Sequence, residues 1–89
     1  MRNLNFLYKM DLPHRAFVVY AYLLDRANDK GECWPSVNTI AADTKMSAAT
    51  VRRAIKDLRK AKLIETHQRY RYNGEKSSLL YKLNKYIEK

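Results

Sequence analysis

The chain has 89 residues, of which 46% are hydrophobic and only two each are glycine and proline. This length predicts one small domain over residues 1–89 and excludes a deep cleft between two lobes. Charge is distributed unevenly, because residues 1–44 contain 5 basic and 5 acidic side chains, whereas residues 45–89 contain 13 and 4 and so carry the whole net charge of +9. The asymmetry favours a polyanionic partner, with nucleic acid ahead of an anionic membrane surface.

Cysteine usage and the N-terminal residues predict a cytoplasmic protein. Cys33 is the single cysteine and has no partner for an internal disulfide. Residues 1–10 include Asn3, Asn5 and Lys9 where a signal peptide would have an apolar run. The longest apolar run, residues 16–24, is nine residues long, and a membrane-spanning helix needs roughly 20.

A first helix is predicted over about residues 12–28. Pro13 in the first turn is a start signal, and the polar run at residues 28–31, which ends in Gly31, is a stop signal. One wide apolar face should form the main surface of the core, and it consists of Ala16, Phe17, Tyr20, Ala21, Leu24 and Ala27. Residues 5–8, ahead of this helix, either add a short strand or lie on the core.

Three large side chains of the same helix, Val18, Val19 and Tyr22, are expected among charged residues on its outward face. Two explanations are open. The N-terminal residues or Tyr86 and Ile87 cover them, or they form the interface of a homodimer, since exposed apolar patches tend to mark contacts. A symmetrical dimer would also suit a palindromic DNA site.

Residues 31–36 are predicted to be an extended connector that ends at Ser36, the N-cap of a second helix over about residues 36–44. Within the connector, Trp34 is expected to pack in the core, because a lone tryptophan beside a helix start usually does so. The alternative is a solvent-exposed platform on which a base stacks.

Residues 45–47 interrupt two helical periodicities and predict a turn, after which Ser47 caps a third helix over about residues 47–61. The core face of this helix comprises Val51, Ala54, Ile55 and Leu58. The opposite face has four cations and no acid, and it comprises Ala49, Arg52, Arg53, Lys56 and Lys60. Surface helices usually alternate acids with bases, so this face favours an anionic partner.

After about residue 61 the periodicity changes from 3.6 to 2, and Asn73–Gly74 is a strong hairpin turn, so a β-hairpin is predicted over about residues 64–83. Arg69 and Arg71 lie on one side of its first strand, and Lys76 follows the turn. A basic hairpin of this kind can act as a wing on phosphates or in a minor groove. Its other face, with Leu79, Tyr81 and Leu83, should pack on the body of the domain.

The order of these elements, together with T-I-A-A-D-x-x-M-S-x-x-T-V-R-R-A-I-x-x-L across residues 39–58 and G-E-x-W-P-S at residues 31–36, resembles the winged helix-turn-helix superfamily. The similarity is to the bacterial, phage and plasmid type found in transcription regulators and replication initiators, and it covers about residues 12–83. It implies a mainly α fold with three helices and two or three short antiparallel strands. Lys45 and Lys62 depart from the pattern, because glycine is common at both positions.

The resemblance implies sequence-specific binding of double-stranded DNA, with the third helix in the major groove. By position, Ser47 touches a phosphate and Arg52 and Lys56 contact the backbone. The residues facing base edges are Ala48, Ala49, Thr50 and Arg53. The hairpin adds Arg69, Arg71 and Lys76. No cofactor or metal is implied.

Two other functions compete with DNA binding. The first is a winged helix used for protein–protein interaction, such as a small phage protein that docks on a host factor. The second, RNA binding through the tyrosine-rich hairpin, is disfavoured because Tyr70 and Tyr72 alternate away from the arginines. Enzymatic activity is not expected, because His14, His67 and Cys33 lie on separate elements and no phosphate loop or carboxylate pair is present.

Overall fold

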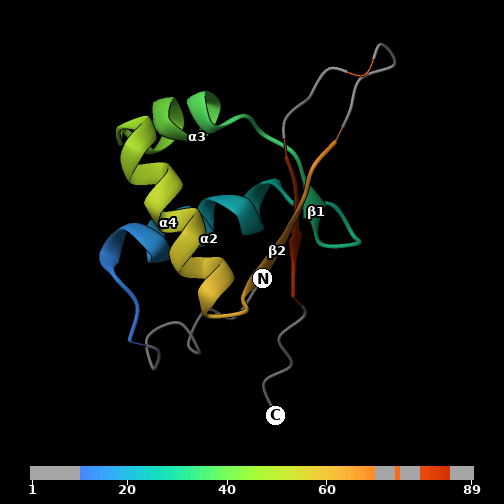
Figure 1. Cartoon of the computed structure of the whole chain (residues 1–89), viewed down its shortest axis with the longest axis horizontal. Helices are drawn as coiled ribbons and strands as arrows, with labels where there is room; N and C mark the ends of the chain where they lie inside the picture. Colours follow the sequence, from blue (N-terminus) through green and yellow to red (C-terminus); the bar gives the residue numbers. More distant parts are fainter. Residues whose placement is uncertain (1–10, 70–73, 75–78, 85–89) are drawn as a thin grey trace.

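The computed structural model describes residues 11–69, 74 and 79–84. Of the expectations above, those on residues 5–8, 70–73, 76, 86 and 87 lie outside them. Three helices pack together and a small sheet lies at their side (Figure 1). The helices are α2 (His14–Arg26), α3 (Val37–Thr44) and α4 (Ala48–Lys60), and the strands are β1 (Glu32–Cys33), β2 (Ile64–His67) and β3 (Leu80–Leu83). This is the predicted architecture, with the third strand included.

The sheet is antiparallel with the order β1-β3-β2, so that β3 lies in the middle. Cys33 and Thr66 both pair with Tyr81, one from each side. The predicted connector therefore contributes a strand of its own. It can do so because the tight turn before it is stabilised by the Asn28 side chain, which accepts hydrogen bonds from the Lys30 and Glu32 amides, and because Gly31 adopts a φ of +77°.

Serine caps begin both helices of the helix-turn-helix, as predicted. The Ser36 hydroxyl oxygen accepts from the Thr39 amide at 3.0 Å, and the Ser47 oxygen accepts from the Thr50 amide at 3.1 Å. Each cap satisfies one of the amides that a first turn leaves without an intrahelical partner. The boundaries of α3 and α4 therefore follow from local sequence.

Lys45 and Lys62, the two positions where glycine is common in similar sequences, both adopt left-handed backbone, with φ of 62° and 63°. In each case the following amide donates to the carbonyl five residues earlier, from Met46 to Ala41 and from Leu63 to Leu58, both at 3.0 Å. This is the Schellman closure of a helix end. The chain thus makes both reversals at the modest cost of placing a lysine in that region.

The buried face of α2 differs from the predicted one. Its buried residues are Ala16, Val19, Tyr20 and Leu23, whereas Phe17, Ala21, Leu24 and Ala27 are only partly buried. Val19 is completely buried, so the expectation that it projects outward is wrong. The sequence does not identify the buried face of this helix, because every residue from 16 to 24 is apolar. Two neighbouring faces therefore both have apolar residues at helical spacing.

The sheet and helices meet around Cys33 and Tyr81, which are 5% and 1% exposed. The Cys33 thiol donates to the Leu23 carbonyl at 3.7 Å. Burial raises the pKa of Cys33 from 9.0 to about 11 and that of Tyr81 from 10.0 to about 12. Both groups are therefore neutral core residues at physiological pH.

Raising the pH above 9 should destabilise the fold through Cys33. The thiol ionises in the unfolded chain near pH 9.0 but in the folded chain only near pH 11, so its contribution is complete below pH 9 and is lost as the pH rises towards 11. The slope per group is at most about 1.4 kcal/mol per pH unit. Urea unfolding between pH 7 and 10 should show the decline in wild type and a weaker one in Cys33→Ala; equal slopes would contradict it.

Candidate nucleic-acid interface

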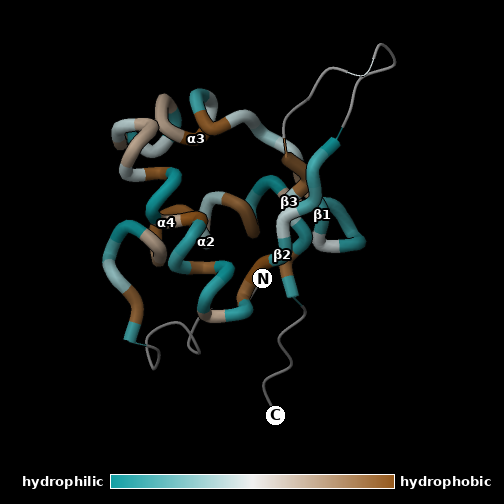
Figure 2. The backbone as a smooth tube through the Cα atoms, viewed as in Figure 1, coloured by the Kyte–Doolittle hydropathy of each residue, from teal (hydrophilic) through white to brown (hydrophobic). Residues whose placement is uncertain are grey.

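The two faces of α4 differ in polarity. Hydrophobic and hydrophilic segments alternate along the helix (Figure 2). Val51, Ala54, Ile55 and Leu58 are buried, as the periodicity predicted. The exposed residues of the helix are Ala49, Arg52, Arg53, Lys56, Arg59 and Lys60. Five cations and an exposed methyl group therefore lie on the solvent side of one 13-residue helix.

Asp57, the only acid of α4, is paired with a residue of another helix. Its carboxylate accepts a hydrogen bond from Nε of Arg15 on α2 at 2.9 Å, and both side chains are partly exposed. The ion pair joins α2 to α4. It contributes little net stability, as partly exposed pairs do, but it leaves the exposed face of α4 entirely cationic.

The N-terminal end of α4 is closed by its own hydroxyl groups. Ser47 donates to the Thr50 hydroxyl at 2.9 Å in addition to accepting from the Thr50 amide. Ala49 is exposed, whereas Ala48 and Thr50 are half-buried. Of the three small residues expected to face base edges, Ala49 is thus the most accessible.

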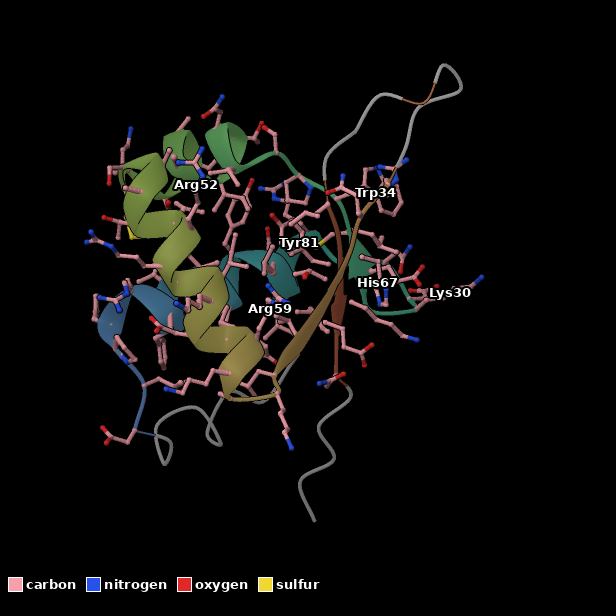
Figure 3. All side chains as sticks on the ribbon, viewed as in Figure 1. Lys30, Trp34, Arg52, Arg59, His67 and Tyr81 are labelled. Atoms are coloured by element: carbon pink, nitrogen blue, oxygen red, sulfur yellow. The ribbon has the colours of Figure 1, made fainter. Side chains whose placement is uncertain are left out.

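A shallow groove separates the C-terminal half of α4 from β2, and Arg59 lies on the side of α4 that faces the sheet (Figure 3). The groove is lined by Lys56, Arg59, Lys60, Ile64, Glu65, Thr66 and His67. Along β2, His67 Nε2 lies 3.4 Å from a carboxylate oxygen of Glu65, two residues earlier on the same strand. The helix side of the groove therefore has three cations, and the strand side has the carboxylate of Glu65 and the imidazole of His67.

The helical pattern places Lys60 on the cationic face of α4, but it predicts a DNA contact for neither Lys60 nor Arg59. Arg59 lies immediately beside the apolar stripe of α4, where a helical projection alone does not separate a groove residue from a core-edge residue. The cationic composition of the helix end was the available signal. Whether Arg59 lines a groove depends on the position of β2, which is set by tertiary contacts.

Trp34 is not a core residue: it is 49% exposed, the only large hydrophobic side chain so exposed in the described part of the chain. Strand alternation explains this, because Cys33 points into the core and the next residue must point out. The Arg69 guanidinium carbon lies 5.4 Å from the centre of the Trp34 ring. Figure 3 shows Trp34 and His67 on the side of the sheet away from the helices.

Tyr22, expected on the outward face of α2, makes contacts within the chain. Its hydroxyl donates to Asp43 of α3 at 2.5 Å, and the Arg26 guanidinium lies 5.4 Å from its ring centre. Partial burial, followed by the bond to Asp43, raises the pKa of Tyr22. The phenol thus connects α2 to the helix-turn-helix, and Val18 is the remaining half-buried residue of the predicted dimer surface.

Neither a metal site nor a membrane span emerges from the geometry. Within residues 11–69, 74 and 79–84, no three His, Cys, Asp or Glu side chains are grouped as metal ligands would be. The described helices are also too short and too polar to cross a bilayer.

Comparison with solved structures shows the same fold in two proteins. A possible transcriptional regulator from Methanosarcina mazei Go1 superposes with a TM-score of 0.66 at 19% identity, covering 84% of this chain and 58% of that one. MepR, a transcription regulator of the Staphylococcus aureus multidrug efflux pump MepA, gives 0.62 and 19%, covering 90% and 53%. The chain thus spans little more than half of either protein.

Sequence comparison places the chain in a family. No curated protein matches it. A family model described as a helix-turn-helix domain matches residues 11–64, which include all three helices and β1 and end at the first residue of β2. The chain therefore belongs to this helix-turn-helix domain family, and its three-stranded sheet and the two superpositions show that it has the winged-helix fold.

Proposed function

We propose that this domain binds double-stranded DNA in a sequence-specific manner and regulates transcription. The observation that carries the proposal is the exposed face of α4, which has five cations while its only acid is paired with Arg15. A helix of this kind fits the major groove, where each base pair presents a distinct pattern of donors and acceptors. Of the two superposed proteins, MepR is described as a transcription regulator and the Methanosarcina mazei protein as a possible one.

Within this proposal, Arg53 reads a base, with guanine as the preferred partner of its two-pronged side chain. Ala49 packs against a thymine methyl, and Ser47, at the helix start, meets a phosphate. Arg52 and Lys56 bind the backbone. To these we add Arg59 and Lys60, because the groove between α4 and β2 holds them beside Lys56.

The hairpin supplies the second contact as a wing. Arg69 lies just beyond β2, and Arg71 and Lys76, which are outside the described residues, are proposed to contact phosphates as well. Some five to seven phosphate contacts in total should give a slope of log affinity against log salt of about −5 to −6.

A symmetrical homodimer on a palindromic site remains part of the proposal, although only a reduced surface supports it. Val19 is buried and Tyr22 is bonded to Asp43, so Val18 is the outward residue on which such an interface would centre. Selection of bound duplexes from a random pool separates the arrangements. A palindrome supports the dimer, and an undivided single site supports a monomer.

Fluorescence anisotropy with a selected duplex and a scrambled one, at several salt concentrations, tests DNA binding. We expect salt-dependent binding with the slope given above and a preference for the selected sequence. Lys56→Gln with Arg59→Gln should reduce the slope by about 2. Lys30→Gln, an exposed cation in the turn before β1, is the matched control and should not change it. Absence of binding at low salt would overturn the proposal and favour a protein-interaction module.

A further inference from the structure

Trp34 and Arg69 lie at the same end of the sheet, just beyond its two outer strands. Cys33 and Thr66 pair with the same residue of β3, Tyr81, from opposite sides. Trp34 follows Cys33 on one outer strand, and Arg69 extends the other. Strands two apart are separated by about 9.5 Å, so only long side chains can meet there. The Arg69 guanidinium carbon lies 5.4 Å from the centre of the indole ring, and this stacked pair therefore joins the ends of the two outer strands.

The two partners differ in how firmly their backbones are held. Trp34 lies between two fixed points, the buried Cys33 and the α3 cap Ser36, whose hydroxyl bonds to Thr39. Arg69 follows the last paired residue of β2, His67, which lies opposite Leu80. Arg69 thus stands two residues beyond the paired part of β2, and the ring of Trp34 is a rigid support for it.

We propose that Trp34 is a positioning residue for Arg69: by stacking on the guanidinium it holds this arginine in one place relative to the helix-turn-helix. This inference rests on the proposed DNA binding. Trp34 is two residues before Ser36, so the contact connects the start of α3 directly to the base of the wing. Arg69 and the helix-turn-helix are then held in one mutual arrangement before the duplex arrives.

The stacked arrangement also suits an arginine that must still meet phosphate. A guanidinium stacked on a ring keeps its donors available at its edge, and holding it in place lowers the rotamer entropy lost on binding. In residues 11–69, 74 and 79–84 no carboxylate forms an ion pair with Arg69. The ring of Trp34, left half exposed at some cost, is its partner there.

A double-mutant cycle on duplex affinity tests the proposal, using Trp34→Leu, Arg69→Gln and the double variant. An exposed cation–π contact corresponds to about a two- to fivefold effect. We therefore expect Trp34→Leu to weaken binding by that factor in wild type and to have almost no effect when Arg69 is already Gln. Trp34→Phe should retain most of the affinity. Lys82→Gln, an exposed cation on the middle strand, is the matched partner and should show no coupling to Trp34.

Several outcomes would overturn the proposal. Unchanged affinity in Trp34→Leu, or losses that simply add in the double variant, would mean that Arg69 binds DNA without help from Trp34. Trp34 would have only a structural role if its replacement lowered the free energy of unfolding so far that the unfolded fraction of the variant accounted for the whole loss of affinity. Urea unfolding of each variant measures this.

A second measurement separates failure of the proposal from failure of DNA binding. Trp34 is the only tryptophan of the chain, so its emission in the DNA-free protein reports the stacked guanidinium. Arg69→Gln should change that emission and Lys82→Gln should not. If no duplex binds wild type, the proposed function fails. The contact itself then stands if the emission changes and is overturned if the emission does not.

Discussion

Replacing Arg53 by alanine should weaken binding to the selected duplex by about 1–3 kcal/mol and relax the preference at one base pair. The side chain is exposed on α4, directly opposite the buried stripe of the helix. A guanidinium at that position reaches two acceptors on one guanine, and alanine reaches neither. Anisotropy titrations against duplexes that vary a single base pair at a time measure both effects.

Arg52→Ala is the matched control, because Arg52 is also exposed on α4 but is proposed to meet phosphate. It should weaken all duplexes by a similar factor and lower the salt slope by about 1. Equal losses on selected and scrambled duplexes for Arg53→Ala would rule out its contact with a base.

Val19→Asp should abolish the folded domain. Val19 is completely buried between α2 and the rest of the core, so a carboxylate there has neither water nor a partner. Burial of an unpaired charge costs several kcal/mol, which approaches the total stability of about 5–15 kcal/mol that domains have. Circular dichroism during urea titration should show no cooperative transition.

Val18→Asp, the neighbouring substitution, should leave the fold intact, because Val18 is only half-buried. If the domain dimerises through this surface, sedimentation should show that Val18→Asp is monomeric while wild type is not. A folded Val19→Asp variant would contradict the buried position of Val19, and a dimeric Val18→Asp variant would exclude the proposed surface.

Local sequence was sufficient to predict the helix-turn-helix. Ser36 and Ser47 cap their helices with hydroxyl oxygens, so both starts are encoded within four residues. Lys45 and Lys62 occur at left-handed positions that the similarity to related sequences had marked as unusual. The core stripe of α4 was also correct, because its apolar residues are separated by charged ones and allow only one face.

Features that depend on contacts between distant elements were not predictable. On α2 an unbroken apolar run concealed which face is buried, and packing against α3 and α4 selected the one with Val19 and Leu23. For Trp34, a lone tryptophan beside a helix start favours the core, and the pairing of Cys33 with Tyr81, which turns Trp34 outward, cannot be read from so short a strand. Arg59 became a site residue only once β2 formed the other side of its groove.

The division of α4 into a buried face and a cationic face has an evolutionary consequence. Val51, Ala54 and Leu58 are fully buried and hold the helix in place, while Arg53 and Ala49 are exposed and take no part in that packing. Exposed positions outside special features tolerate substitution within about 0.5 kcal/mol. A lineage can therefore change the preferred DNA sequence one residue at a time without passing through an unfolded intermediate, so target divergence need not be accompanied by compensating changes in the core.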